Sequence, residues 1–304
     1  MNKKHKSFTL IELLVVIVII GILAGVIMIS TSSSVNKATL AKATVFSSTV
    51  QEELLLNVVS GWSFDEGTGT VGNTVTASDI TDDWGNYNGS IGNTPILKGD
   101  GCFSKKCVEF NSVDDDFISM SSFFGTALKG SSHVSINDYD KNATITAWAN
   151  PFLLDATDRF VFSDNNWNEG YVALQSNQIS ARWGSGIISH SANPEQRWYF
   201  ITITHKMDLT ANVYRFHLYI DGQYVGSMAP STIPMATSYG PDSTLRIGKF
   251  WNGLIDNIMI YDETLSSSQI REQYISGLNL MFSNGIISKE DYNLRIEELT
   301  YGKK

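Results

Sequence analysis

Two patterns of hydrophobic and polar positions divide the chain. Near the N-terminus an almost uninterrupted apolar run follows Lys3, Lys4 and Lys6, and residues 13–36 contain no charged side chain. As an α-helix, these 24 residues span roughly 36 Å, which exceeds the hydrocarbon core of a bilayer, about 30 Å thick. The pattern predicts a single transmembrane helix, with the lysines on the cytoplasmic side and the body of the protein outside.

Helical periodicity continues beyond this run. Apolar side chains recur every three to five residues from Val35 to Val50, and the pattern ends at Ser60. A long N-terminal α-helix is therefore predicted over residues 8–60. Its second half either packs on the following domain or forms an extracellular stalk, and the absence of Pro and Gly from residues 35–55 favours packing.

From Trp62 to Tyr261 the pattern changes to short alternating runs separated by Gly, Asn, Asp and Ser, which is typical of antiparallel strands joined by turns. Asp221-Gly222 lies between two such runs and predicts a two-residue hairpin with positive φ at both positions. The regular turn spacing predicts a mainly β fold, a two-sheet antiparallel sandwich or jelly roll. Strands are expected at Ala143–Ala149, Tyr199–His205, Tyr214–Ile220 and Leu254–Tyr261.

After the last expected strand, signals for helix starts return. Ser266 to Ser268 offer N-caps, and Ser288 precedes Asp291 by three residues, nearly as in a capping box. These C-terminal helices either pack on the sandwich or contact neighbouring subunits. The predicted organisation is a leader at residues 1–7, the helix at 8–60, the sandwich at 61–264 and a helical segment at 265–304.

Composition narrows the function classes. The chain has 304 residues, of which 42% are hydrophobic, enough for a sizeable core. Beyond residue 60 it carries 17 basic and 28 acidic side chains, a net charge of 17 − 28 = −11, so no direct nucleic-acid binding is expected. The two Cys and five His lack metal-ligand spacing, which argues against a metal hydrolase.

Glu12 is the only charged residue between Lys6 and Lys37. A carboxylate inside an apolar helix costs about 2.5–3.5 kcal/mol on membrane-insertion scales, so its presence indicates a use, most simply pairing with a cation supplied by a partner. A cleaved secretory signal or a plain signal anchor shares the basic start and the apolar run, but neither accounts for Glu12.

The segment KSFTLIELLVVIVIIGILAGVIM, residues 6–28, resembles the N-terminus of type IV prepilins and pseudopilins. The resemblance implies that a prepilin peptidase cuts between Ser7 and Phe8 and that the new amino group of Phe8 is methylated. It also implies that Glu12 pairs with the N-terminal amine of a neighbouring subunit during assembly. The family usually has Gly where this chain has Ser7, so an uncut membrane anchor is the alternative.

The body of the chain is similar to laminin-G-like, or concanavalin A-like, jelly-roll domains of bacterial surface proteins. The resemblance implies two stacked antiparallel sheets, followed by a short closing helix from Leu265-Ser266 to Tyr274. It is carried, in order, by WSFDEGTG, CVEFNSVDDDFISM, TITAWANP, WYFITITHK, YIDGQYVGS and LRIGKFWNGLIDNIMIYDETLSSSQI. The side chains expected in the core are Trp62, Phe64, Phe110, Trp148, Trp198 and Ile247.

Cys102 and Cys107 close a short loop in a segment expected outside the cytoplasm, which favours a structural disulfide worth roughly 2–3 kcal/mol at most. A redox pair is the alternative, but the CxxC spacing is missing.

The loop ASDITDDWGNYNG, residues 77–89, corresponds to a loop that holds structural calcium in related domains, together with an acid of the penultimate strand. The resemblance thus implies calcium as the one candidate cofactor; the alternative is that these residues form turns. The candidate ligands are Asp79, Asp82, Asp83, Asn86, Asn88 and Asp256.

Trp167 and Trp251 are candidates for stacking on a sugar ring. No catalytic residue is predicted, because the chain has neither the ExDxxE pattern of glucanases nor a GxSxG elbow. The favoured interpretation is a pilin-like surface subunit that displays a lectin-like jelly roll for adhesion or carbohydrate binding, with prepilin peptidase, other pilin-like subunits and the membrane as partners. The alternatives are a minor pseudopilin of a secretion or DNA-uptake machine and a membrane-tethered glycan-active enzyme.

Overall fold

The computed structural model describes eleven stretches of the chain. They are residues 10–11, 13–21, 54–84, 87–120, 142–163, 170–183, 186–191, 196–208, 210–211, 213–228 and 244–301. The chain forms two compact units, Met1–Glu52 and Glu53–Lys304.

In the first unit, residues 10–11 and 13–21 are α-helical. Within the described residues, no helix combines the length and the apolar character that a membrane crossing requires. The rest of the transmembrane helix expected at residues 13–36 lies outside the described residues, as do Ser7, Phe8 and Glu12.

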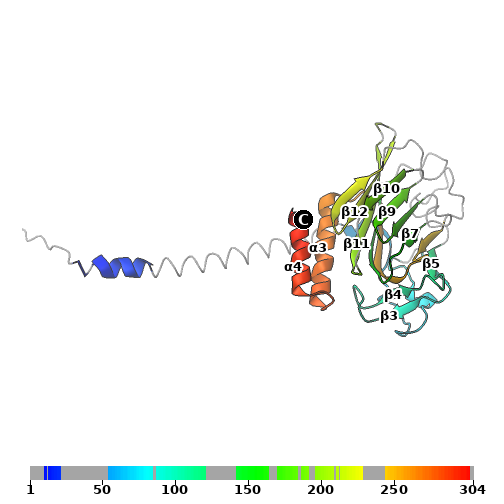
Figure 1. The fold of residues 1–304 in the computed structure, drawn as a ribbon, viewed down its shortest axis with the longest axis horizontal. Helices are drawn as coiled ribbons and strands as arrows, with labels where there is room; N and C mark the ends of the chain where they lie inside the picture. The colour runs from blue at the N-terminus through cyan, green and yellow to red at the C-terminus, as the bar shows by residue number, and fades with distance from the viewer. Residues whose placement is uncertain are drawn as a thin grey trace, which may run out of the picture. The chain divides into compact units, whose positions relative to one another are not determined.

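The second unit is a sandwich of two antiparallel sheets followed by two helices (Figure 1). Sheet A has the order β13-β12-β11-β6-β15-β4-β3, with β1 also paired to β15, and sheet B has the order β10-β9-β8-β7-β14-β5-β2. The predicted mainly β sandwich is confirmed. The strands of sheet A are β1 (Val58–Trp62), β3 (Ile96–Lys98), β4 (Cys107–Phe110), β6 (Ala143–Pro151), β11 (Tyr199–Asp208), β12 (Val213–Ile220), β13 (Gln223–Ser227) and β15 (Gly253–Tyr261). Those of sheet B are β2 (Ser90–Gly92), β5 (Phe117–Met120), β7 (Arg159–Ser163), β8 (Gly170–Leu174), β9 (Gln178–Trp183), β10 (Gly186–Ser191) and β14 (Leu245–Ile247).

The turn between β12 and β13 is the predicted two-residue hairpin. Asp221 and Gly222 have φ values of 52° and 72°, as a type I′ turn requires. The four expected strands correspond to β6, β11, β12 and β15, which extend up to three residues beyond the predicted bounds.

The prediction of a helix over residues 8–60 is wrong at its C-terminal end, because residues 58–60 belong to a strand. Val58–Trp62 forms β1, which pairs with β15 through partners such as Gly61 and Met259. The β-branched pair Val58-Val59 and the cross-strand partners of β15 outweigh any remaining helical periodicity.

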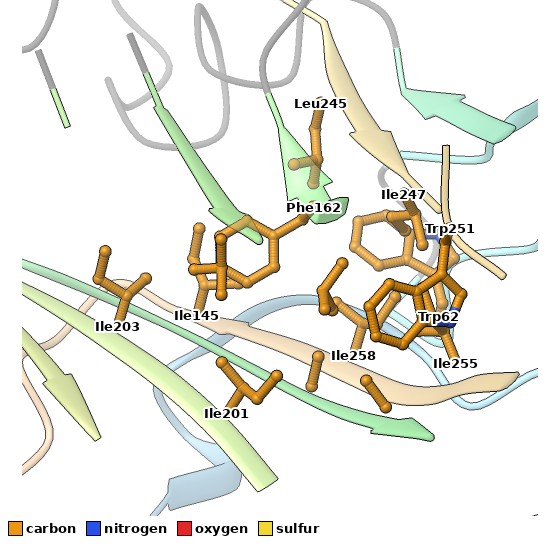
Figure 2. Close-up of a cluster of buried hydrophobic side chains, with 14 of the residues drawn as sticks. Trp62, Ile145, Phe162, Ile201, Ile203, Leu245, Ile247, Trp251, Ile255 and Ile258 are labelled. Carbon is orange, nitrogen blue, oxygen red and sulfur yellow. The ribbon is translucent and has the colours of Figure 1, made fainter. Parts of the chain in front are cut away.

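The main core lies between the two sheets (Figure 2). Trp62 and Ile247 are fully buried there, and Phe64 and Phe110 are almost so. Burial of such large side chains supplies the main stabilisation of the sandwich.

A second apolar layer covers the outer face of sheet A, the face turned away from sheet B. Helices α3 (Ser267–Ser283) and α4 (Lys289–Tyr301) lie side by side on this face (Figure 1). Trp148 of β6 stacks on Phe103 with ring centroids 4.4 Å apart, and on Tyr274 of α3 at 5.8 Å. Trp148 and Trp198 are therefore buried as expected, but under the helices and loop rather than between the sheets.

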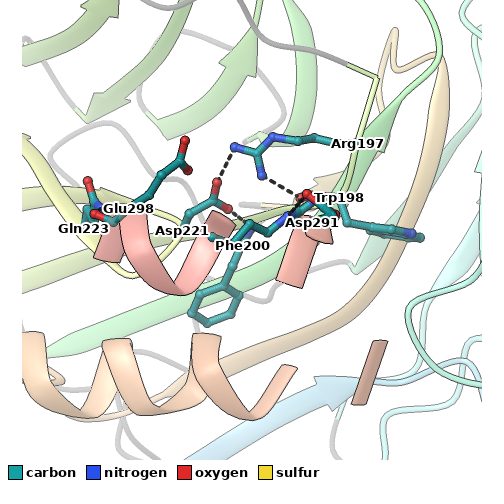
Figure 3. Close-up of polar contacts among 8 residues, drawn as sticks. Arg197, Trp198, Phe200, Asp221, Gln223, Asp291 and Glu298 are labelled. Atoms are coloured by element: carbon teal, nitrogen blue, oxygen red, sulfur yellow. Dashed lines mark hydrogen bonds and ion pairs between the residues drawn. The ribbon is translucent and has the colours of Figure 1, made fainter. Parts of the chain in front are cut away.

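Polar contacts fasten α4 to the sheet (Figure 3). Buried Arg295 of α4 donates a hydrogen bond from Nη1 to the carbonyl oxygen of Trp198 at 2.9 Å, and it pairs with Asp291 one turn earlier. Arg197 and Asp221 form an ion pair at 2.6 Å beside this contact. The C-terminal helices thus belong to the same compact unit as the sandwich.

Gly277 of α3 allows this close packing, and we expect Gly277→Ala to lower the free energy of unfolding by about 1–3 kcal/mol. A Cβ at this position would lie 2.1 Å from Cζ2 of Trp148. The sign of this change in stability is informative, because Gly→Ala at an open helix position raises the free energy of unfolding by about 1 kcal/mol. Chemical denaturation checks it, with Glu272→Ala on the same helix as the control; equal effects of the two substitutions would contradict the close contact.

Candidate functional site

The acidic loop at residues 77–89, which follows β1, has carboxylates that accept hydrogen bonds from nearby backbone amides. Asp79, at the end of the 3-10 helix η1 (Ala77–Asp79), accepts bonds from the Gly69 amide at 2.7 Å and the Thr76 amide at 2.8 Å. Burial favours the protonated form of Asp79, but the hydrogen bonds from Thr76 and Gly69 outweigh it and lower the pKa of Asp79. Asp79 therefore closes a turn as an ionised carboxylate.

Asp82 lies at the centre of the same loop and is almost fully buried. Its Oδ1 accepts from the amides of Gly61 and Trp84, and its Oδ2 from the Ser60 hydroxyl and the Tyr87 amide, all at 2.7–3.0 Å. Both oxygens are thus committed to donors that connect the loop to β1.

The other candidate ligands in this loop have similar roles. Asp83 accepts from the Ser63 amide at 3.0 Å, and burial raises its pKa. Asn88 accepts from the Asp82 amide at 3.0 Å. Asn86 lies outside the described residues.

Asp256 of β15 is fully buried and faces the loop between Cys102 and Cys107, away from the acidic loop. Its Oδ2 accepts from the Ser104 amide at 3.0 Å and lies 3.1 Å from the Ser104 hydroxyl, which is also 3.2 Å from Asp65. Burial, together with the nearby carboxylate of Asp65, raises the pKa of Asp256 well above its usual range, although Ser104 opposes the shift. Within the described residues, Oδ1 of Asp256 has no hydrogen-bond partner.

The described candidate ligands for calcium lie in two separate places. In the described part of the loop the carboxylates accept hydrogen bonds from backbone amides, whereas Asp256 contacts Ser104. Among the described residues, no group of three or more His, Cys, Asp or Glu side chains is placed to hold a metal ion. Calcium bound by the full set, including Asn86, stays a prediction.

Cys102 and Cys107 form the expected disulfide. The bond closes the loop that carries Phe103, which stacks on Trp148, and Ser104, which contacts Asp256. The disulfide therefore holds a loop that belongs to the second apolar layer.

The structure corrects the expectation for Trp251. Its side chain has an exposed fraction of 0% and packs in the core between the sheets, beside Ile247 and Ile255 (Figure 2). A ligand cannot reach it without unfolding the sandwich. Trp167 lies outside the described residues, so its proposed role in sugar stacking stays a prediction.

A group of aromatic side chains at the β12–β13 hairpin was missed by the sequence analysis. The rings of His217 and Tyr224 lie 5.6 Å apart, as do those of Tyr219 and Tyr224. Tyr224 is 55% exposed. The available signal was the alternation of YRFHLYI, which places His217 and Tyr219 on the face opposite Phe216 and Leu218.

Two segments of the chain are similar to known families. Residues 2–28 match the prokaryotic N-terminal methylation motif, and residues 128–271 match the concanavalin A-like lectin/glucanases superfamily. These two matches agree with the two sequence resemblances, the N-terminal one to type IV prepilins and the other to laminin-G-like jelly-roll domains. No curated protein matches the chain.

Several solved structures are similar to the chain at low identity. Domain 4 of AbnA, an extracellular arabinanase from Geobacillus stearothermophilus solved with arabinotriose, is 16% identical with a TM-score of 0.49, over 71% of this chain and 97% of that one. The binding domain of Paraclostridial Mosquitocidal Protein 1 is 17% identical with a TM-score of 0.49, over 74% and 53%. The binding domain of botulinum neurotoxin DC, in complex with rat synaptotagmin II, is 13% identical with a TM-score of 0.49, over 73% and 53%. The matches span about half the length of these two toxin domains.

Proposed function

We propose that this protein is a pilin-like surface subunit that displays its jelly roll outside the cell for binding to a surface carbohydrate. After cleavage between Ser7 and Phe8, the N-terminal helix anchors the subunit in the membrane with its start on the cytoplasmic side, and then joins it to other pilin-like subunits. The observation that carries the proposal is the methylation motif at residues 2–28 in the same chain as a lectin-like domain.

Glu12 supports the assembly part of the proposal. It lies four residues after Phe8 in a run otherwise free of charge up to Lys37, where an unpaired carboxylate is costly. The amine of a neighbouring Phe8 would neutralise it, so a subunit gains stability when it enters a filament.

The state of three candidate carboxylates supports binding rather than catalysis. Asp79 and Asp82 are engaged by backbone amides, and Asp256 is buried in the second apolar layer. None of these is placed to act as a paired acid and nucleophile on a substrate, which requires two carboxyl groups flanking one bond.

The proposal predicts a defined mature N-terminus. In cells that contain a prepilin peptidase, mass spectrometry of the protein recovered from membranes and from sheared surface material will show a chain that starts at Phe8 with one added methyl group. Ser7→Gly will retain this product, because a small residue precedes the cut, whereas Ser7→Leu will leave Met1–Ser7 attached. An unprocessed wild-type chain would contradict assembly and leave a membrane-anchored binding domain.

Glu12→Leu separates processing from assembly. This variant will be cut and methylated but will be lost from sheared filaments, because the partner of the neighbouring amine is gone. The abundance of the wild-type chain in the same material distinguishes a major subunit, which dominates the filament, from a minor pseudopilin.

A further inference from the structure

Helices α3 and α4 cover only part of the outer face of sheet A. Helix α3 lies over Trp148 and Phe200, and Gly222 at the β12–β13 turn lies against Tyr274 of α3. Farther along β12 and β11, Arg215 and Lys206 are exposed. Among the described residues, the part of this face that the helices leave exposed begins at the aromatic group of the hairpin and extends toward these two cationic side chains.

Two rings hold the exposed ring of Tyr224 in place. Tyr224 meets His217 at an interplanar angle of 88° and Tyr219 at 70°, so both contacts are edge-to-face. Tyr219 is itself buried, and its hydroxyl lies 3.1 Å from that of Ser267 at the start of α3. A supported, exposed ring loses little conformational entropy when a ligand stacks on it.

The cationic end of the surface is set by strand register. Lys206 of β11 pairs with Arg215 of β12, and Thr204 pairs with His217, so the cations follow directly after the aromatic group. From Tyr219 to Arg215 is four residues, or about 13 Å along the strand. Asp208 is the acidic neighbour, 3.4 Å from Arg215.

Charge favours an anionic ligand at this end. The chain beyond residue 60 has a net charge of 17 − 28 = −11, and against this background Lys206 and Arg215 face the same side of the sheet. Burial and the nearby charges of Arg215 and Lys206 lower the pKa of His217, so its ring is neutral at neutral pH and contributes an aromatic surface.

We propose that this surface, formed by Lys206, Arg215, His217, Tyr219 and Tyr224, binds an acidic polysaccharide. A sugar ring stacks on Tyr224, and a carboxylate or sulfate of the same polymer faces Lys206 and Arg215. The proposal rests on the function proposed above, that the jelly roll binds a carbohydrate, and it names the site and the ligand class.

The test uses the full chain in detergent and measures its affinity for immobilised polygalacturonate, for the methyl-esterified polymer and for neutral galactan. Wild type will bind polygalacturonate, with an affinity that falls as salt is added. Tyr224→Ala will weaken binding about tenfold, Tyr224→Phe will restore it, and Lys206→Gln will weaken binding to polygalacturonate about threefold without affecting the esterified polymer. Phe282→Ala is the matched control, an aromatic residue of α3 that is 43% exposed, and will bind as wild type does.

The outcomes separate the two proposals. Tight binding to polygalacturonate that survives both Tyr224→Ala and Lys206→Gln would place the site elsewhere and overturn this inference alone. Preference for galactan or for an oligothymidylate over polygalacturonate would overturn the ligand class. Failure to bind any polysaccharide of an extended panel would overturn the carbohydrate-binding function and this inference together. Thermal unfolding of each variant shows whether a loss reflects binding or folding.

Discussion

Trp251→Ala will lower the free energy of unfolding by about 3–5 kcal/mol, the cost typical of removing a large aromatic side chain from a packed core. Trp251 is fully buried between the sheets, in contact with the cluster that includes Trp62 and Ile247 (Figure 2). Neither sheet can close over the cavity without disturbing its own strand pairing. Denaturation in urea measures the loss, and saccharide binding by the folded fraction will be unchanged.

Trp251→Phe provides the matched control. Within the described part of the chain, Nε1 of Trp251 is buried without a hydrogen-bond partner, so phenylalanine gives up no hydrogen bond and most of the apolar volume remains. We expect less than half the loss caused by alanine. If either substitution abolished saccharide binding without changing stability, Trp251 would instead be a ligand-binding residue.

Asp82→Ala will lower the free energy of unfolding by about 3 kcal/mol. Four donors converge on this carboxylate, from Ser60, Gly61, Trp84 and Tyr87. Each donor left buried and unpaired costs about 1–3 kcal/mol, and water entering the space of the lost side chain recovers part of the sum. Thermal and chemical denaturation in the presence of EDTA measure the loss without any contribution from calcium.

Asp83→Ala is the control for this substitution. Asp83 was predicted as a calcium ligand together with Asp82. It accepts a hydrogen bond from the Ser63 amide and keeps much of its side chain at the surface, so its loss will be within about 0.5 kcal/mol. Repeating both measurements with calcium chloride tests the metal directly. If calcium raises the stability of wild type and both substitutions abolish that increase equally, the two residues are ligands and the hydrogen-bonding account of Asp82 is insufficient.

The sequence predicted the local features that depend on neighbouring residues. The Asp221-Gly222 turn is a property of two adjacent residues, and Ser266 caps α3 by accepting from the Gln269 amide, as its position suggested. The Cys102–Cys107 bond was expected from the five residues of separation and from the location predicted outside the cytoplasm. None of these requires knowledge of the rest of the fold.

The surroundings of individual side chains were less predictable, because they depend on contacts between distant segments. Trp251 follows a turn and resembles a loop residue, yet Phe250 before it has a φ of 57° and the chain directs the indole between the sheets. Asp256 was expected near the acidic loop, but β15 pairs with β4, which brings it to the disulfide loop instead. Periodicity indicates which face a residue occupies, not which segment covers that face.

The pairing of β1 with β15 has a consequence for how the sandwich folds. Val58 pairs with Tyr261, so the first strand of the sandwich can pair only after a strand about 200 residues later in the chain is available. If the chain crosses the membrane from its anchored N-terminal end, β1 stays an open strand edge until nearly all of the domain has crossed. Such distant pairing gives a high contact order and slow folding, and an unpaired edge invites aggregation. Completion of the fold therefore coincides with the arrival of the C-terminal segment, which supplies both β15 and the helices that cover sheet A.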